Sequence, residues 1–175
     1  MTGPAPAAKS KDNRGGPFLP TVSTSPELSA FTAVLEREGL HGALRHLNAR
    51  TPFRFTGVYA FGGETLRNVA LFDRWNPQEA KGADAPMDET FCAIVGLTDG
   101  LLEVVDGRID PRFPRMQKNA VQSYCGAPIR DESGTPVGTL CHFDLMPCQA
   151  PSAELPLLTA AAAQLLPYLQ PLLVR

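Results

Sequence analysis

Residues 123–144 read SYCGAPIRDESGTPVGTLCHFD, two apolar-rich runs on either side of turn-forming residues. The runs are 123–130 and 137–145, and the residues between them supply the Asp, Ser, Gly and Pro that turns favour. This pattern predicts a β-hairpin. Successive side chains of a strand point to opposite faces, so we expect Cys141 and His142 on different faces. His142 and Asp144 share a face, where the carboxylate could accept a hydrogen bond that orients the imidazole.

The segment before the hairpin reads as an ordered corner. Asp110-Pro-Arg-Phe-Pro114 excludes regular structure, because its prolines remove donors and bias the preceding residues away from the helical region. Such a corner commonly needs a carboxylate to hold its backbone amides, and Asp106 and Asp110 are the candidates. We expect Arg112 to pair with one of these carboxylates rather than to face an anionic ligand.

These motifs together resemble a known family. Tyr124-Cys-Gly-Ala-Pro128 and Val137-Gly-Thr-Leu140, preceded by Asp106 and Asp110-Pro-Arg-Phe113, are similar to the closing part of GAF domains, small sensory modules that fold around one ligand-sized pocket. The resemblance extends over about residues 27–169. It implies an α/β (α+β) fold with a GAF/PAS-like antiparallel sheet, the N- and C-terminal helices on one face and a ligand pocket on the other.

Residues 1–24 are expected to be a disordered tail, and residues 25–175 a single GAF-like domain. Ser25-Pro26 predicts a helix start, with a break at Gly39 and an apolar stripe that continues to Asn48. A first hairpin is predicted over 53–61 and 66–72, and a loop over 74–86. We further expect a short helix capped by Asp88, a strand over 101–105, and a last helix over 153–169 that begins at Ser152, kinks or ends at Pro167 and stops by Pro171.

Composition excludes several function classes. The net charge of −2 and pI near 5.9 argue against nucleic acid and anionic membrane surfaces as partners. An apolar run of about 18 residues and a signal peptide are both missing, so a cytoplasmic protein without a membrane span is expected. The four cysteines are therefore expected to be thiols, and the paired spacing of a structural zinc site is absent.

The resemblance implies a sensor with a small-molecule ligand that signals by self-association, as a homodimer, or through a partner protein. It specifies no cofactor, catalytic residue or metal. Aromatic walls with a few polar groups suit such a pocket, and the predicted ligand-binding residues are Phe55, Tyr59, Phe72, Trp75, Phe91, Cys92, Tyr124, Cys125, His142 and Asp144. Alternate residues of a strand face away, so this set is wider than the true site. Trp75 is either a lid over the pocket or a partly buried surface anchor.

Two alternatives stay open. One is a thiol-based redox enzyme or redox sensor, similar to the single-domain free-methionine sulfoxide reductases, although their Gly-Lys-Gly-Val-Cys-Gly type motif is missing. The other is an interaction module with a filled pocket. The signatures of cyclic-nucleotide-binding and bilin-binding GAF domains are not found.

Overall fold

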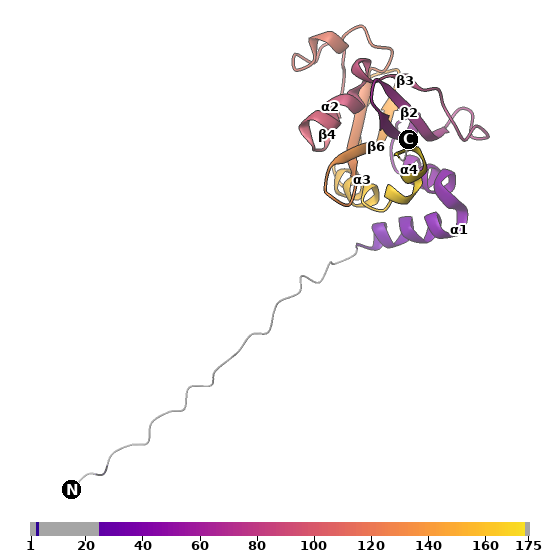
Figure 1. Ribbon diagram of the computed structural model, residues 1–175, viewed down its shortest axis with the longest axis vertical. Coiled ribbons are helices and arrows are strands. Elements are labelled where there is room, and N and C mark those ends of the chain that lie inside the picture. Colours follow the sequence, from indigo (N-terminus) through magenta and orange to yellow (C-terminus); the bar gives the residue numbers. More distant parts are fainter. Residues whose placement is uncertain (1–2, 4–24, 174–175) are drawn as a thin grey trace.

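The computed structural model describes residue 3 and residues 25–173 (Figure 1). The predicted disordered tail therefore lies, except for Gly3, outside the described residues. The elements are α1 (Pro26–Asn48), β1 (Phe55–Gly62), β2 (Thr65–Asp73), β3 (Ala85–Pro86), η1 (Met87–Glu89), α2 (Phe91–Thr98), β4 (Leu102–Val104), η2 (Pro114–Met116), β5 (Ser123–Arg130), β6 (Pro136–Asp144), α3 (Glu154–Ala162) and α4 (Leu166–Leu173).

The six strands form an antiparallel sheet in the order β3-β2-β1-β6-β5-β4. The predicted hairpin of residues 123–144 is confirmed as β5 and β6, with Cys125 opposite His142. Its turn is held by Asp131, whose Oδ1 accepts the backbone N–H groups of Ser133 at 2.9 Å and Thr135 at 3.0 Å. Gly134 takes a φ of 88°, which glycine adopts without steric cost.

The helix starts follow local capping chemistry. Ser25 caps α1 as predicted, since its Oγ accepts the N–H of Leu28 at 3.1 Å, and Gly39 breaks the helix with a φ of 74°. The predicted cap of the second helix was wrong. Asp88 lies within the short helix η1, and the extended residue Thr90 caps α2 by accepting the N–H of Ala93 at 3.2 Å.

The C-terminal segment forms two helices instead of one. α3 and α4 are separated by residues 163–165, so the predicted interruption comes just before Pro167, which occupies the first turn of α4 where no donor is needed. Pro171 was wrongly predicted to stop the helix: it lies inside α4, because one lost donor is tolerated in a short helix anchored by the fully buried Leu169. Ser152 does not cap α3, which begins after Ala153 without a side-chain cap.

The sheet separates two apolar cores, as the resemblance implied. On one face α1, α3 and α4 pack together (Figure 1) around a large core that includes Phe31, Leu44, Val58, Leu140 and Leu169. On the other face α2 and the loops cover a smaller core with Phe91, Val95, Tyr124 and Cys141. The face of the sheet on which the pocket was expected therefore lies opposite the terminal helices.

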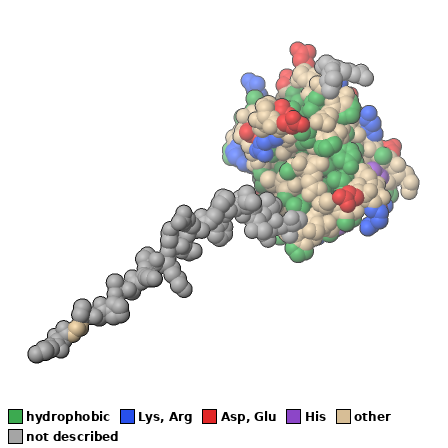
Figure 2. Space-filling model, turned by 60° about the horizontal axis from the view of Figure 1, so that its bottom comes forward, with side chains coloured by type: hydrophobic (Ala, Val, Ile, Leu, Met, Phe, Trp, Pro, Cys, Tyr) green, Lys and Arg blue, Asp and Glu red, His purple; other side chains and the backbone are tan. Residues whose placement is uncertain are grey.

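The surface agrees with the low net charge. Basic and acidic side chains are interspersed with apolar ones on the face shown in Figure 2. Among the described residues, the helices are too short or too polar to cross a bilayer.

Candidate ligand-binding site

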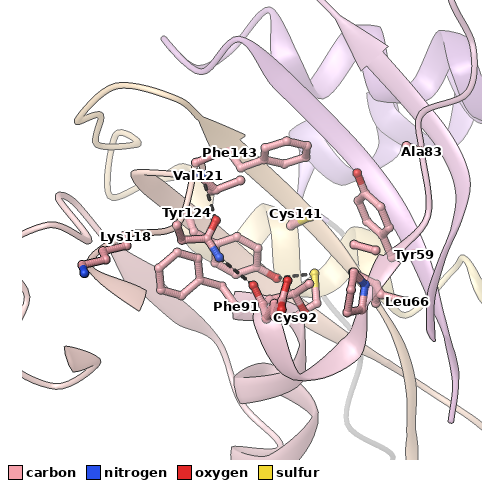
Figure 3. A pocket seen from close by; sticks show the side chains of 16 residues that line it. Tyr59, Leu66, Ala83, Phe91, Cys92, Lys118, Val121, Tyr124, Cys141 and Phe143 are labelled. Carbon is pink, nitrogen blue, oxygen red and sulfur yellow. Dashed lines mark hydrogen bonds between the residues drawn. The ribbon is translucent and has the colours of Figure 1, made fainter. Parts of the chain in front are cut away.

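A cavity of about 390 Å³ lies between α2 and the face of the sheet opposite the terminal helices (Figure 3). Strands β1, β2, β5 and β6, the start of α2 and the segment before β5 all contribute to its wall. The lining residues are Tyr59, Leu66, Ala83, Ala85, Pro86, Glu89, Thr90, Phe91, Cys92, Lys118, Asn119, Ala120, Val121, Tyr124, Cys141 and Phe143. A second, wider hollow beside Phe61 and Met87 is bordered by the largely exposed Leu97 and is a surface feature.

Four aromatic rings shape the cavity. Phe91 and Tyr124 pack with their centroids 5.5 Å apart, and Tyr59 and Phe143 are 6.3 Å apart. Phe113 contacts Phe91 edge-on at 6.1 Å from outside the cavity. Because both members of each pair are held by neighbours on different elements, the walls are largely formed before any ligand enters.

The segment before β5 is tied to η1 at the edge of the cavity. Asn119 donates from Nδ2 to the carbonyl of Glu89 at 2.6 Å, and its Oδ1 accepts the N–H of Val121 at 2.9 Å. In Figure 3 the Lys118 amine points away from the aromatic rings. The wall is thus mainly aromatic and aliphatic, and Glu89, Lys118 and Asn119 add polar groups to it.

A cluster of sulfur and hydroxyl groups lies inside the cavity. The Tyr124 hydroxyl donates to Cys92 Sγ at 3.2 Å, and the Thr139 hydroxyl donates to the same sulfur at 3.1 Å (Figure 3 shows Cys92 and Tyr124). Cys141 lines the same cavity, and its thiol donates to the Gly57 carbonyl at 3.7 Å. Cys92 is the second residue of α2, where the helix dipole favours negative charge.

These contacts separate the acidities of the two thiols. Burial raises the pKa of Cys92, but the neighbouring Cys141 thiol and the hydrogen bonds from Thr139 and Tyr124 outweigh it, so the pKa lies below its ordinary value. Burial and the neighbouring Cys92 raise the pKa of Cys141 well above the usual range. Burial, together with the Cys92 charge, likewise raises the pKa of Tyr124. The arrangement therefore makes Cys92 the more acidic of the two thiols.

Four of the ten predicted ligand-binding residues, Tyr59, Phe91, Cys92 and Tyr124, line this cavity. Their binding role stays a prediction. The structure places the other six outside the lining. Phe72 and Cys125 belong to the core beneath the terminal helices, and burial together with the Glu103 charge raises the pKa of Cys125 to about 12. Phe55 stacks on Phe143 with centroids 4.8 Å apart, behind the wall.

His142 and Asp144 do not form the possible orienting pair. Cys141 and His142 point to opposite faces, as predicted, and the buried His142 Nδ1 hydrogen-bonds Thr56 Oγ1 at 2.7 Å. Burial, with a smaller effect of a nearby arginine, lowers the pKa of His142 to about 3. Asp144 instead accepts the backbone N–H groups of Arg54 at 2.9 Å and Met146 at 3.2 Å. Both residues serve the fold at the positions observed.

Trp75 is an exposed surface residue and not a lid. Its side chain is 74% exposed, and the Arg54 guanidinium lies 3.9 Å from the ring centroid. Arg54 is fixed in turn by a two-point ion pair with Asp73, both bonds at 2.8 Å. No local pattern indicated this arginine, because Asp73 and Trp75 become its neighbours only when β2 pairs with β1.

The ordered corner matches its prediction. Asp106 accepts the N–H of Arg108 at 3.1 Å, and Asp110 accepts the N–H of Arg112 at 3.0 Å. Arg112 pairs with Asp110 at 2.7 Å, as favoured over an anionic ligand. Hydrogen bonds and charge from the arginines lower the pKa values of both carboxyl groups, which therefore act as structural ions.

Several lining residues were not among the predicted ones. Cys141, Phe143 and the nearby Thr139 share one face of β6, and strand alternation was the signal that could have found them. Given that Tyr124 faces the pocket, the pairing of Tyr124 with Phe143 would have selected odd-numbered residues of β6. Leu66 and Val121 carry no such local signal, since their positions depend on how distant loops close.

Comparisons with known proteins agree with this architecture. The sequence profile described as GAF domain matches residues 36–166. A cyclic di-GMP phosphodiesterase, PA2567 of Pseudomonas aeruginosa, is 38% identical over 73 residues, which span 39% of this chain and only 12% of that protein. Among solved structures, the GAF domain of an Acinetobacter phosphoenolpyruvate-protein phosphotransferase has a TM-score of 0.64 at 14% identity, with 82% of this chain and 90% of that chain covered.

Two solved free methionine-R-sulfoxide reductases are also similar in fold. The type II enzyme of Thermoplasma acidophilum has a TM-score of 0.59 at 15% identity, covering 81% of this chain and 95% of its own. The enzyme of Neisseria meningitidis, solved in complex with its substrate, has a TM-score of 0.58 at 15% identity, covering 85% of this chain and 93% of its own. At this level of identity the likeness concerns the fold alone.

Proposed function

The chain belongs to the GAF domain family, and we propose that it is a sensory module that binds a small molecule in the cavity between α2 and the sheet. The cytoplasm, where free thiols persist, is the compartment that this proposal assumes. The observation that carries it is the cavity itself, which combines preformed aromatic walls with a few convergent polar groups. Its volume lies within the range of roughly 300–1,000 Å³ that is common for small-ligand sites.

The walls favour a particular class of ligand. Tyr59, Phe91, Tyr124 and Phe143 offer ring faces and edges to a compact, mainly apolar or planar molecule. The hydroxyl groups of Tyr59 and Tyr124 supply the polar contacts that orient it. Apart from Glu89 and Lys118, the lining residues carry no fixed charge, so a strongly charged ligand would find little counter-charge in the cavity.

We further propose that the output passes through self-association or a partner protein that contacts α1 and α4. A ligand changes such an equilibrium only by its differential affinity for the two states. The terminal helices pack on the reverse side of strands that line the cavity, so a shift of β1 or β6 reaches them directly.

A thermal-shift screen of a metabolite library tests the binding proposal. A ligand at about 100 times its Kd stabilises the folded state by about 2.7 kcal/mol. Val121→Trp fills the opening of the cavity, and Leu97→Trp adds the same ring at an exposed site as the matched control. Compounds that stabilise the native chain and Leu97→Trp are expected to fail with Val121→Trp. Equal stabilisation of all three proteins would place binding elsewhere, and a library without any stabilising compound would favour the filled interaction module.

A second candidate function is sulfoxide reduction. Its specific support is that two thiols, Cys92 and Cys141, line the cavity, and that two reductases of free methionine sulfoxide share the fold. Chromatographic detection of methionine, with dithiothreitol as reductant, tests it. Turnover that Cys125→Ser retains and Cys92→Ser loses would establish the activity, whereas the absence of methionine from the native protein would dismiss it.

A further inference from the structure

We propose that Cys92 and Cys141 form a reversible redox pair, which a hydroperoxide entering the cavity converts to a disulfide. The pair joins two elements that are distant in sequence, since Cys92 lies on α2 and Cys141 on β6. Both thiols line the cavity although both are buried from bulk solvent. The inference needs no reversible ligand, so it stands apart from the proposed sensory function.

Cys92 has the environment of an attacking sulfur. Two donors, the Tyr124 and Thr139 hydroxyls, point at one sulfur atom at the start of a helix. A structural cysteine buried in an apolar core needs neither of these donors. Hydrogen bonds and a helix N-terminus are the features that stabilise a reactive thiolate.

Cys141 is the only cysteine placed to resolve an oxidised Cys92 among the residues that the structure describes. It lines the same cavity as Cys92 and lies two residues from Thr139 on the face of β6 that contacts Cys92, and its thiol donates to the Gly57 carbonyl at 3.7 Å. Cys125 and Cys148 pack against the core of the terminal helices, on the other side of the sheet. The sheet thus places Cys92 and Cys141 on the cavity side and Cys125 and Cys148 on the opposite side.

The chemistry balances with a hydroperoxide, ROOH, as the oxidant. The Cys92 thiolate attacks the outer peroxide oxygen, the O–O bond breaks, and the leaving alkoxide or hydroxide takes a proton to give ROH and a sulfenic acid. The Cys141 sulfur then attacks the Cys92 sulfur, its proton leaves with the hydroxyl as water, and the S–S bond forms. Two thiols are oxidised by two electrons, and ROOH is reduced by the same two.

The disulfide would change the cavity. It ties α2 to β6, and the Tyr124 and Thr139 hydroxyls lose the thiolate that they stabilise. Either donor must then find another acceptor or turn into the cavity. Oxidation therefore alters the shape and polarity of the interior at the centre of the sheet.

Peptide mapping of the full-length protein tests the proposal. The reduced chain is treated with an equimolar amount of hydrogen peroxide or cumene hydroperoxide, blocked with N-ethylmaleimide and digested. We expect a Cys92–Cys141 linked peptide that dithiothreitol removes, and oxidation of Cys92 at least about tenfold faster than of Cys125, whose pKa is raised to about 12. Faster reaction with cumene hydroperoxide would assign the oxidant to the organic class, and faster reaction with hydrogen peroxide to the inorganic one.

Two variants give a readout that a merely structural role would not move. Cys141→Ser is expected to stop at the sulfenic acid, which dimedone traps at Cys92, and Cys125→Ser is the matched control that keeps the disulfide. A native protein in which Cys92 is oxidised no faster than Cys125, or in which Cys92 pairs with Cys148, would overturn the proposal. That measurement uses the unaltered chain, so it decides the question even where a variant fails to fold.

Discussion

Replacing Gly126 with alanine is expected to disturb both the stability of the fold and the acidity of Cys92. Gly126 and Tyr124 lie on the same face of β5, and the Tyr124 ring lies across the glycine. A Cβ atom added at position 126 would be 2.5 Å from Cε1 and Cζ of that ring and would overlap its hydroxyl oxygen. Ordinary contacts between carbon atoms are about 3.5–4.0 Å, so the ring must move by about 1 Å or more.

The direction of this movement follows from the packing. Phe91 contacts the Tyr124 ring on one side, and the free volume lies in the cavity. The phenol is therefore expected to enter the cavity and to lose its 3.2 Å hydrogen bond to Cys92. Overpacking of this kind costs about 1–3 kcal/mol of unfolding free energy.

The effect on the thiol has its own magnitude. A hydrogen bond to a charged group contributes about 1.5–3 kcal/mol, and a shift of one pKa unit corresponds to about 1.4 kcal/mol. Loss of the Tyr124 hydroxyl should therefore raise the pKa of Cys92. Tyr124→Phe removes the same hydroxyl without the added methyl group, so it should reproduce the pKa change with a smaller loss of stability.

Urea unfolding and the pH dependence of Cys92 alkylation measure the two effects. Gly100→Ala is the matched control, because a Cβ atom there meets only the Thr98 carbonyl at 3.8 Å. Gly126→Ala with native stability would show that the ring has room beside the strand. An unchanged alkylation profile in both Gly126→Ala and Tyr124→Phe would refute the inference that this hydroxyl stabilises a thiolate.

Three further predictions concern the fold. Asp73→Asn should lower the free energy of unfolding by about 1–2 kcal/mol and change Trp75 fluorescence. The hydrogen bonds from Arg54 lower the pKa of Asp73 beneath its ordinary 3.8, so the stability that this carboxylate contributes is present above about pH 4 and is lost as the pH falls; an acid titration of the variant should not show this loss. Burial lowers the pKa of His142 from 6.5 to about 3, so the unfolded chain binds an extra proton below pH 6.5 and the free energy of unfolding should fall by about 1 kcal/mol between pH 7 and pH 5.5. Urea unfolding measures this fall, which should be missing in His142→Asn; a fall of equal size in the variant would assign the effect to other groups. Leu44→Ala, at a fully buried position, should lower the free energy of unfolding by about 2–5 kcal/mol in the same assay. Leu97→Ala, at a position that is 87% exposed, should change it by no more than about 0.5 kcal/mol, and similar losses in the two variants would contradict the observed burial.

Local chemistry explains which elements were predictable from the sequence. The turn at Gly134, the cap at Ser25 and the break at Gly39 each depend on a few neighbouring residues, and all three were found where expected. Asp88 and Thr90 are both acceptable caps, and only the backbone conformation distinguishes them. Pro171 was misjudged for a related reason, because burial of the helix around it outweighs the local penalty of a missing donor.

The cavity was harder to predict because its wall is made of residues from many elements. Aromatic and cysteine residues were identified as candidates, and the adjacent residues Tyr124 and Cys125 were both included. A strand points two successive side chains to opposite faces, so only Tyr124 lines the cavity and Cys125 lies in the core beneath the helices. Phe72 was included as an aromatic residue, and Trp75 because its loop was expected to lie near the pocket. Choosing the correct residues requires the register of β5 against β6 and the position of α2, which are properties of tertiary packing.

The same alternation ties the cavity to the terminal helices. Thr139, Cys141 and Phe143 face the cavity side of β6, whereas Leu140 and His142 pack among the residues beneath the helices, and a side chain at position 138 would meet Leu169 of α4. With one layer of sheet between the two cores, β6 cannot move toward or away from α2 without changing its contact with α4. Interiors packed at crystal-like density pass on such displacements and do not absorb them. A change at Cys92, whether a bound molecule or a bond to Cys141, is therefore coupled through one strand to the helical surface on the far side.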